Sequence, residues 1–247
     1  MPAINSSAAP SARYDRRVRH NGVQAGRRLI AQTAAIAAVI VAALWTQSPP
    51  ARAGVPPGRI ISLIPSDDEV SQFVGLPVRH VDDPLPVRPR GPDHLDQRDE
   101  CRALVYDNTE DVWGSDYAAF RGQNWSAPSD PDLGVSQSVG TFTSASAARD
   151  RFNAAYNPNL FNICNHAEFR GPGVNPGVTL ELYDFKVNDP VIMWTLAGKY
   201  YGQYNGWNSV HVAWHLDNVI SISSIGQDGN PNQAVKRLTD YILSRVG

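Results

Sequence analysis

Residues 134–164 read GVSQSVGTFTSASAARDRFNAAYNPNLFNIC, and this stretch decides the fold. Val135 to Thr141 alternate between larger and smaller side chains, the period of a half-buried β-strand. Thr143 and Ser144 then offer a helix N-cap, and apolar residues recur after them at helical spacing. Cys164 closes the unit. The stretch therefore predicts a strand, an amphipathic helix and a cysteine at the helix end.

The segments before this stretch predict two helices and a further strand. Ser66 and Glu69 have the spacing of a capping box, and Asp67 and Asp68 lie in the first turn, where the helix dipole favours acids. Helix capping explains this acidic triplet better than a metal site does. The predicted elements are a helix after Ser66, a second helix from about Asp96 to Gly114 with Cys101 inward, a strand over 117–125, and a loop over 126–133.

The segments after Cys164 predict four strands and a last helix. The two strand pairs are 179–187 with 191–197 and 210–216 with 219–225. Asp217-Asn218 is a good two-residue hairpin turn, which pairs Leu216 with Val219. The C-terminal helix has Asn230 as its cap. Because the loops between strands are short, we expect an α+β fold with a largely antiparallel sheet and flanking helices.

The N-terminal 57 residues differ in composition from the remainder. Residues 1–28 are Arg-rich and predict a basic, disordered cytoplasmic tail, and 29–46 form a hydrophobic segment followed by a Pro-rich linker over 47–57. The segment is short for a membrane span. It is either a retained anchor or a signal peptide cleaved after Ala53, at an A-x-A site. In both cases the positive charge before it predicts export of the following domain to the cell envelope or outside the cell.

Charge and cysteine content limit the function further. From residue 54 onward, 15 Lys and Arg stand against 23 Asp and Glu, so a nucleic-acid partner is not expected. The two cysteines, Cys101 and Cys164, fit either buried thiols or one disulfide. Export to an oxidising compartment favours the disulfide.

Motifs for catalysis are missing from the sequence, which has no G-x-S-x-G, H-E-x-x-H, phosphate loop or C-x-x-C. The most metal-like pair is His211 and His215. On a strand these side chains share a face but lie roughly 13 Å apart, so they cannot chelate one ion by themselves. We therefore expect neither a metal nor a cofactor, and we interpret both histidines as residues that line a cleft.

An aromatic stretch at 198–207 is the second candidate for ligand contact. Its rings can stack on sugars or aromatic ligands, or simply cover a sheet edge. In the predicted register, His211 and His215 share a face with Ile220 and Ile222, opposite the face that takes the helices. We predict that the stretch folds over the face that carries His211 and His215 and forms a wall of the cleft. The aromatic residues that it would contribute are Tyr200, Tyr201, Tyr204 and Trp207.

Several of these features together resemble one known family. They are Cys101 after an acidic helix start, the strand with Gln137, the helix beginning at Ser144-Ala145, Cys164, and the late strand Asn218-Val219-Ile220. Their order is similar to that of the PknH-like extracellular sensor domain, which forms the external part of actinobacterial receptor kinases and also occurs in stand-alone exported proteins. The resemblance covers residues 58–247. This chain departs from the family in having two cysteines instead of four and Phe161 in place of a tryptophan.

The resemblance implies a cleft-bearing antiparallel sheet that senses an extracellular ligand, and it supplies no catalytic residues. We therefore predict a non-enzymatic, envelope-exposed sensor that binds a small molecule, glycan or envelope lipid and is attached to the membrane through 29–46. Two alternatives are a hydrolase that acts on envelope material with Asp and His residues in a cleft, and a structural module that binds other proteins. An enzyme should bring an acid and a base within hydrogen-bond reach in one pocket.

Overall fold

The computed structural model describes residues 54–81, 86–91, 95, 98–170 and 177–246. The predicted tail, the hydrophobic segment and most of the Pro-rich linker lie outside these residues. Within the described part, no helix combines the length and apolar character needed to cross a membrane.

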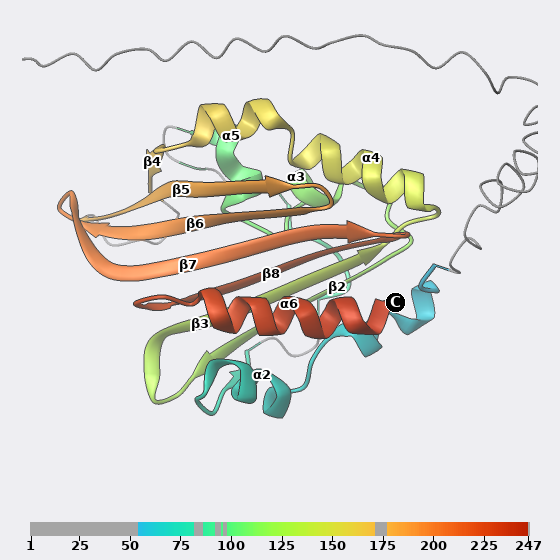
Figure 1. Cartoon of the computed structure of the whole chain (residues 1–247), viewed down its shortest axis with the longest axis horizontal. Helices are drawn as coiled ribbons and strands as arrows, with labels where there is room; N and C mark the ends of the chain where they lie inside the picture. The colour runs from blue at the N-terminus through green and yellow to red at the C-terminus, as the bar shows by residue number, and fades with distance from the viewer. Residues whose placement is uncertain (1–53, 82–85, 92–94, 96–97, 171–176, 247) are drawn as a thin grey trace, which may run out of the picture. The chain divides into compact units, whose positions relative to one another are not determined.

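A single eight-stranded sheet forms the centre of the domain, in the order β1-β2-β3-β8-β7-β6-β5-β4 (Figure 1). Every neighbouring pair is antiparallel. The strands are β1 (Arg79–His80), β2 (Ala119–Ala127), β3 (Asp130–Thr141), β4 (Glu168–Phe169), β5 (Val178–Asn188), β6 (Val191–Tyr200), β7 (Gln203–Leu216) and β8 (Val219–Asp228). This is the predicted α+β architecture.

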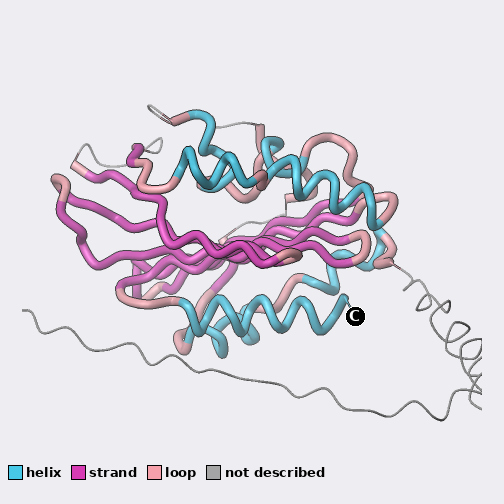
Figure 2. The backbone as a smooth tube through the Cα atoms, turned by 45° about the horizontal axis from the view of Figure 1, so that its top comes forward, coloured by secondary structure: helices cyan, strands magenta, loops and turns pink. Residues whose placement is uncertain are grey.

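Helices lie on both faces of the sheet (Figure 2). They are η1 (Pro57–Leu63), α2 (Asp67–Val74), η2 (Asp99–Leu104), α3 (Glu110–Trp113), α4 (Ala145–Ala155), α5 (Pro158–Cys164) and α6 (Asn232–Val246), where η marks a 3-10 helix. The predicted caps are present: Ser66 and Glu69 form the capping box of α2, and the Ser144 side chain accepts a hydrogen bond from Ala147 N.

Alternation along the central strands produces two separate cores. On one face Phe152 of α4, Trp194 of β6 and Ile220 of β8 pack together with η2, α3 and α5. On the other face Trp214 of β7 and Leu238 of α6 pack together with η1 and α2. Both faces of the central sheet are therefore buried.

The predicted hairpin register is confirmed. β7 and β8 pair Leu216 with Val219 and His215 with Ile220, about a turn at Asp217-Asn218. The predicted division of side chains between the two faces is confirmed with it. The prediction that the helices take only the face opposite His211 and His215 is wrong, because α4 and α5 cover the face of these histidines as well (Figure 2).

Three predicted boundaries are wrong. The helix expected from Asp96 to Gly114 is two short helices, η2 and α3, because Asp107 and Asn108 favour local turns over helix interiors. The central helix is divided into α4 and α5 at Pro158, whose ring cannot continue a helix. The loop predicted over 126–133 is a two-residue turn, and β2 and β3 extend on either side of it.

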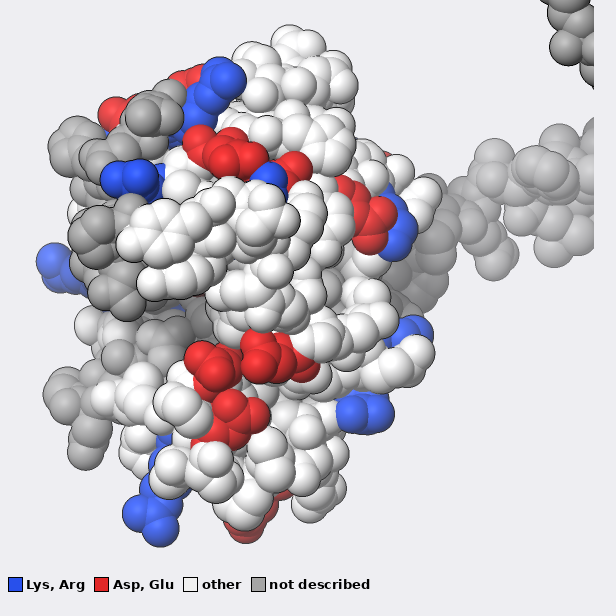
Figure 3. All heavy atoms as spheres, turned by 90° about the vertical axis from the view of Figure 1, so that its left-hand side faces the viewer, with Lys and Arg blue, Asp and Glu red and all other residues white. Residues whose placement is uncertain are grey.

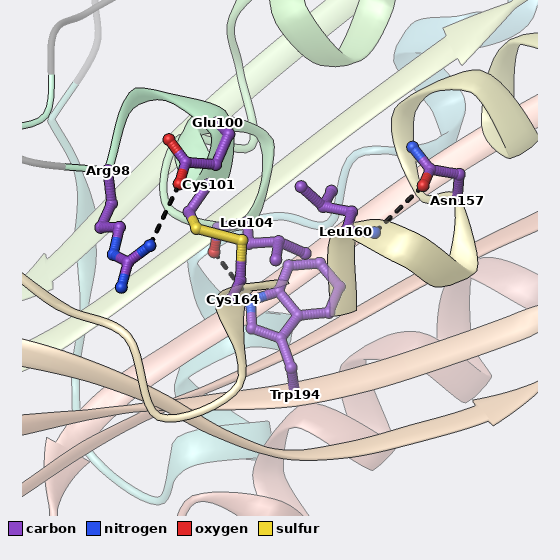
Figure 4. The surroundings of a disulfide bond; sticks show 8 residues. All are labelled: Arg98, Glu100, Cys101, Leu104, Asn157, Leu160, Cys164 and Trp194. Carbon is purple, nitrogen blue, oxygen red and sulfur yellow. Dashed lines mark hydrogen bonds and ion pairs between the residues drawn. A yellow bond between two sulfur atoms is a disulfide. The ribbon is translucent and has the colours of Figure 1, made fainter. Parts of the chain in front are cut away.

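The predicted disulfide is present between Cys101 of η2 and Cys164 at the end of α5 (Figure 4). Both cysteines are fully buried, and their Cα atoms lie 5.8 Å apart. Beside the bridge, Trp194 Nε1 donates a hydrogen bond of 2.7 Å to the carbonyl oxygen of Leu104. The bridge and this hydrogen bond both hold η2 against the layer formed by α5 and β6.

Candidate ligand-binding site

The register of the sheet places five side chains in one row across five strands. Asn124 of β2 lies opposite Ser136 of β3, which lies opposite Ser224 of β8. Ser224 in turn lies opposite His211 of β7, and His211 lies opposite Trp194 of β6. Directly opposed residues point to the same face of a sheet. The row therefore gives the face covered by α4 and α5 a polar strip within an otherwise apolar core.

Asp107 lies against this strip from the segment between η2 and α3. Trp113 Nε1 donates a 2.7 Å hydrogen bond to the Asp107 carbonyl oxygen, which holds the backbone in place. The Asp107 carboxylate accepts hydrogen bonds from Ser136 Oγ at 3.4 Å and from Ser224 Oγ at 3.3 Å. Two neutral and rather long hydrogen bonds satisfy this carboxylate only weakly.

Burial dominates the electrostatics of Asp107. Only 7% of the residue is exposed. Burial raises the pKa of Asp107 to about 6, and the hydrogen bonds from Ser136 and Ser224, with the charge of Arg90, oppose this rise only in part. An ionised, poorly paired carboxylate at neutral pH is a feature that occurs more often at functional sites than in plain cores.

His211 is the second titratable group of the site. Its ring stacks on Trp194 at 5.1 Å between centroids, and Nε2 lies 3.1 Å from Ser209 Oγ. Nδ1 is buried without a hydrogen-bond partner among the described residues. Burial lowers the pKa of His211 to about 3, so the imidazole is neutral at physiological pH. It can therefore either donate or accept one further hydrogen bond.

These groups line a pocket with a volume of about 350 Å³. Arg88, Arg90 and Tyr106 complete its walls. Arg90 Nε donates to Asn108 Oδ1 at 3.1 Å, which ties the wall to the residue after Asp107. The size suits a small molecule, at the lower end of the usual range for ligand pockets. In this pocket the Asp107 carboxylate can accept hydrogen bonds from a ligand, and the Arg88 and Arg90 guanidinium groups can donate them.

The structure separates the residues that the sequence grouped as one site. His211 lines the pocket, but His215 packs its ring on Phe152 of α4 at 4.9 Å and lies 3.3 Å from Asp189 Oδ1. Tyr204 is seven residues from His211 along β7, about 23 Å away. The aromatic stretch is therefore the end of the β6–β7 hairpin, which lies far from the pocket along the sheet.

The remaining aromatic residues are also at the β6–β7 end. Tyr200, Tyr201 and Tyr204 are exposed, whereas Trp207 is half-buried and donates from Nε1 to the Asp132 carbonyl oxygen at 3.0 Å. Ligand contact by His215 and by these four aromatic residues stays a prediction. Among the described residues, no group of three or more side chains could hold a metal ion.

Sequence reasoning missed Asp107, Ser136 and Ser224. Asp107 falls inside a predicted helix, where a polar residue is ordinary and does not indicate a binding site. The signal that could have indicated the site lies in β3. Ser136 and Ser138 are polar residues on a face that a strand buried on both sides would fill with apolar residues.

The fold and the site define an α+β domain on one antiparallel sheet, with one disulfide and a partly open pocket of mixed polar and apolar lining on one face. The family described as "PknH-like extracellular domain" matches residues 55–245, and the chain belongs to this family. None of the curated proteins matches the sequence.

A solved structure shows the same fold. The crystal structure of the extracellular domain of PknH from Mycobacterium tuberculosis is 19% identical, with a TM-score of 0.67 over 78% of this chain and 97% of that chain. An uncharacterised protein from Mycobacterium smegmatis is 9% identical, with a TM-score of 0.34 over 72% of this chain and 95% of that chain, which is too distant to support an argument.

Proposed function

We propose that this protein is a non-enzymatic, envelope-exposed sensor that binds a small polar molecule in the pocket beneath Asp107. Membership in a family of extracellular domains supports the sensor role. The observation that carries the proposal is the buried Asp107 carboxylate, which two serine hydroxyls satisfy only weakly. A buried charge of this kind costs stability, and a ligand that pairs with it would relieve that cost.

The chemistry of the pocket limits the ligand. Asp107 accepts hydrogen bonds, so the ligand places a donor there, either an ammonium-type cation or a hydroxyl. Arg88 lines the same pocket and suits an acceptor or anionic group of the ligand. The neutral His211 can pair with either kind of group. A small molecule that carries both a donor and an acceptor therefore fits best.

The pocket does not favour the hydrolase alternative. Asp107 and His211 both line it, but they share no hydrogen bond in the described part of the chain, where Asp107 bonds to serines and His211 to Ser209. Burial lowers the pKa of His211 to about 3, too low for a general base at neutral pH. Asp107, with its pKa raised to about 6, is in the range for a general base, but among the described residues its carboxylate accepts hydrogen bonds from serines and not from a second titratable group. The pair therefore lacks the arrangement that acid–base catalysis requires.

The test is a thermal-shift screen of the purified full chain with small amino acids, amines, polyols and amino sugars. A ligand at a hundred times its dissociation constant should stabilise the native protein by about 2.7 kcal/mol. Asp107→Asn and His211→Ala should lose the shift. His215→Ala is the matched control, since it lies on the same strand and face but outside the pocket. Loss of the shift in His215→Ala alone, or a shift that survives Asp107→Asn, would contradict the proposed site.

Export and attachment form the second part of the proposal. The basic tail at 1–28, the hydrophobic segment at 29–46 and the family of extracellular domains support a domain outside the cytoplasm, held at the membrane by that segment unless it is cleaved after Ala53. A reporter enzyme that is active only in the cytoplasm should be silent when fused after Gly247. Strong reporter activity would refute export.

A further inference from the structure

The tip of the β6–β7 hairpin presents three tyrosines that neither the core nor the pocket uses. Tyr200, Tyr201 and Tyr204 are 53%, 77% and 63% exposed. The rings of Tyr200 and Tyr201 meet edge to face, with centroids 4.5 Å apart. Large aromatic rings normally bury much of their area, so three exposed rings on one hairpin tip form an unusual surface.

The turn itself shows that an aromatic ring at the tip is not the conformationally favoured choice. Tyr201 and Gly202 form the two-residue turn, with φ angles of 48° and 79°. Asn, Asp or Gly is favoured in such a turn because side chains with bulk are strained at positive φ. Tyr201 occupies this strained position and extends its ring into solvent, an arrangement that stability alone would not select.

Neighbouring groups hold the tip rigid. A Cβ atom added to Gly177 would lie 3.0 Å from Tyr201 and 3.1 Å from Tyr200, so both rings pack over this glycine. Tyr204 OH donates a 2.5 Å hydrogen bond to Glu181. Lys199 lies 4.8 Å from the Tyr204 ring centroid and pairs with Glu181 at 2.6 Å. Rigid rings lose little conformational entropy on binding.

The charges around the tip select against anionic partners. Lys199 is balanced by two carboxylates, those of Glu168 at 2.5 Å and Glu181 at 2.6 Å. Figure 3 views the molecule from this end of the sheet and shows acidic side chains above and below an uncharged area, with some Lys and Arg side chains beside the upper ones. Phosphate-bearing lipids and polymers would be repelled here. Uncharged sugar rings, whose apolar faces stack on tyrosine and whose hydroxyls pair with carboxylates, are not repelled.

The tip also lies at the opposite end of the sheet from the point where the chain enters the domain. Val55 N donates to Asn218 Oδ1 at 2.8 Å and Asn218 Nδ2 donates to Val55 O at 3.0 Å, at the β7–β8 turn. β7 runs from Gln203 to Leu216, so the two ends are about 45 Å apart (Figure 1). The tip therefore lies at the end of the sheet opposite Val55, near which the described part of the chain begins.

We propose that the tyrosine tip, defined as Tyr200, Tyr201 and Tyr204, docks the domain onto the glycan strands of cell-wall peptidoglycan, whose pyranose rings carry no phosphate. The exposed rings stack on the apolar faces of pyranose units, and the half-exposed carboxylate of Glu168 accepts hydrogen bonds from sugar hydroxyls. This contact is independent of the pocket at Asp107.

The test is co-sedimentation of the purified full chain with purified insoluble peptidoglycan. Tyr201→Asn removes a ring and also relieves the turn, so folding is retained; it should weaken binding about two- to tenfold, the value of one aromatic contact. Tyr201→Phe keeps the ring and should bind like the wild type. Val187→Asn is the matched control, since Val187 is an exposed apolar residue at the far end of β5.

Three outcomes would overturn the proposal. They are wild-type protein that does not sediment with peptidoglycan, Tyr201→Asn that sediments as well as the wild type, and Val187→Asn that loses sedimentation to the same extent as Tyr201→Asn. Asp107→Asn serves to separate the two proposals, because it should lose small-molecule binding but sediment normally.

Discussion

Replacing Asp107 with asparagine should make the protein more stable at neutral pH, although two hydrogen bonds reach the carboxylate. In the folded state the pKa of Asp107 is raised from 3.8 to about 6, chiefly by burial. The folded protein therefore binds the proton more tightly than the unfolded chain does, and stability falls as pH rises from about 4 to about 6. A difference of this size corresponds to about 3 kcal/mol at pH 7.

The assay is urea denaturation of the wild type and Asp107→Asn at intervals between pH 4 and pH 8. Other groups titrate as well, so the measured quantity is the difference in unfolding free energy between the two proteins. It should favour the variant by up to about 3 kcal/mol above pH 7 and shrink towards pH 4. Asp150→Asn, on an exposed side chain of α4, should show no such trend. An Asp107→Asn variant that is less stable than the wild type at pH 7.5, or a flat difference, would refute this reasoning.

Three further variants test the remaining contacts. Cys101→Ser opens the loop of 63 residues closed by the bridge and should cost roughly 4 kcal/mol in urea denaturation; an unchanged midpoint would contradict this. Burial raises the pKa of Glu181, but hydrogen bonds from Lys199, Tyr204 and His166 outweigh burial and lower this pKa to about 2. The ionised carboxylate therefore stabilises the folded state, and this contribution is lost as pH falls from about 4.5 to 2. Glu181→Gln should therefore lower the free energy of unfolding at pH 7 by at most about 3 kcal/mol, and by less where solvent screens the ion pair. It should also weaken the loss of stability with falling pH below about 4.5. Asn218→Ala removes both hydrogen bonds to Val55 and should cost about 2 kcal/mol, with faster amide exchange at Val55 as the direct readout.

The strands were predictable because their patterns are local. The period-two alternation at 134–141 predicted that this segment is a strand, and the turn at Asp217-Asn218 set the β7–β8 register. The helix caps at Ser66 and Ser144 were equally local. The two caps and the turn are contacts between residues fewer than ten positions apart.

The site was not predictable, because it is assembled from contacts between residues far apart in the sequence. Asp107 meets Ser224 across 117 positions, and no local pattern marks either residue as a partner of the other. His211 was identified for its residue type, and the same reasoning selected His215, which the structure places beside Phe152 instead. Only the order of strands, with β8 between β3 and β7, brings the two serines and His211 into one row.

The disulfide and the buried carboxylate should be energetically coupled. Cys101 lies in η2, and Asp107 follows three residues after η2 ends at Leu104, so the bridge restrains the segment that buries Asp107. A looser segment admits water, and hydration moves the pKa of a carboxyl group back towards its ordinary value. The gain in unfolding free energy from Asp107→Asn at pH 7 should therefore be smaller in a Cys101→Ser/Cys164→Ser background than in the bridged protein. A double-mutant cycle measured by urea denaturation gives this difference directly. Strictly additive effects would mean that the Leu104–Trp194 hydrogen bond and core packing hold the segment in place without the bridge.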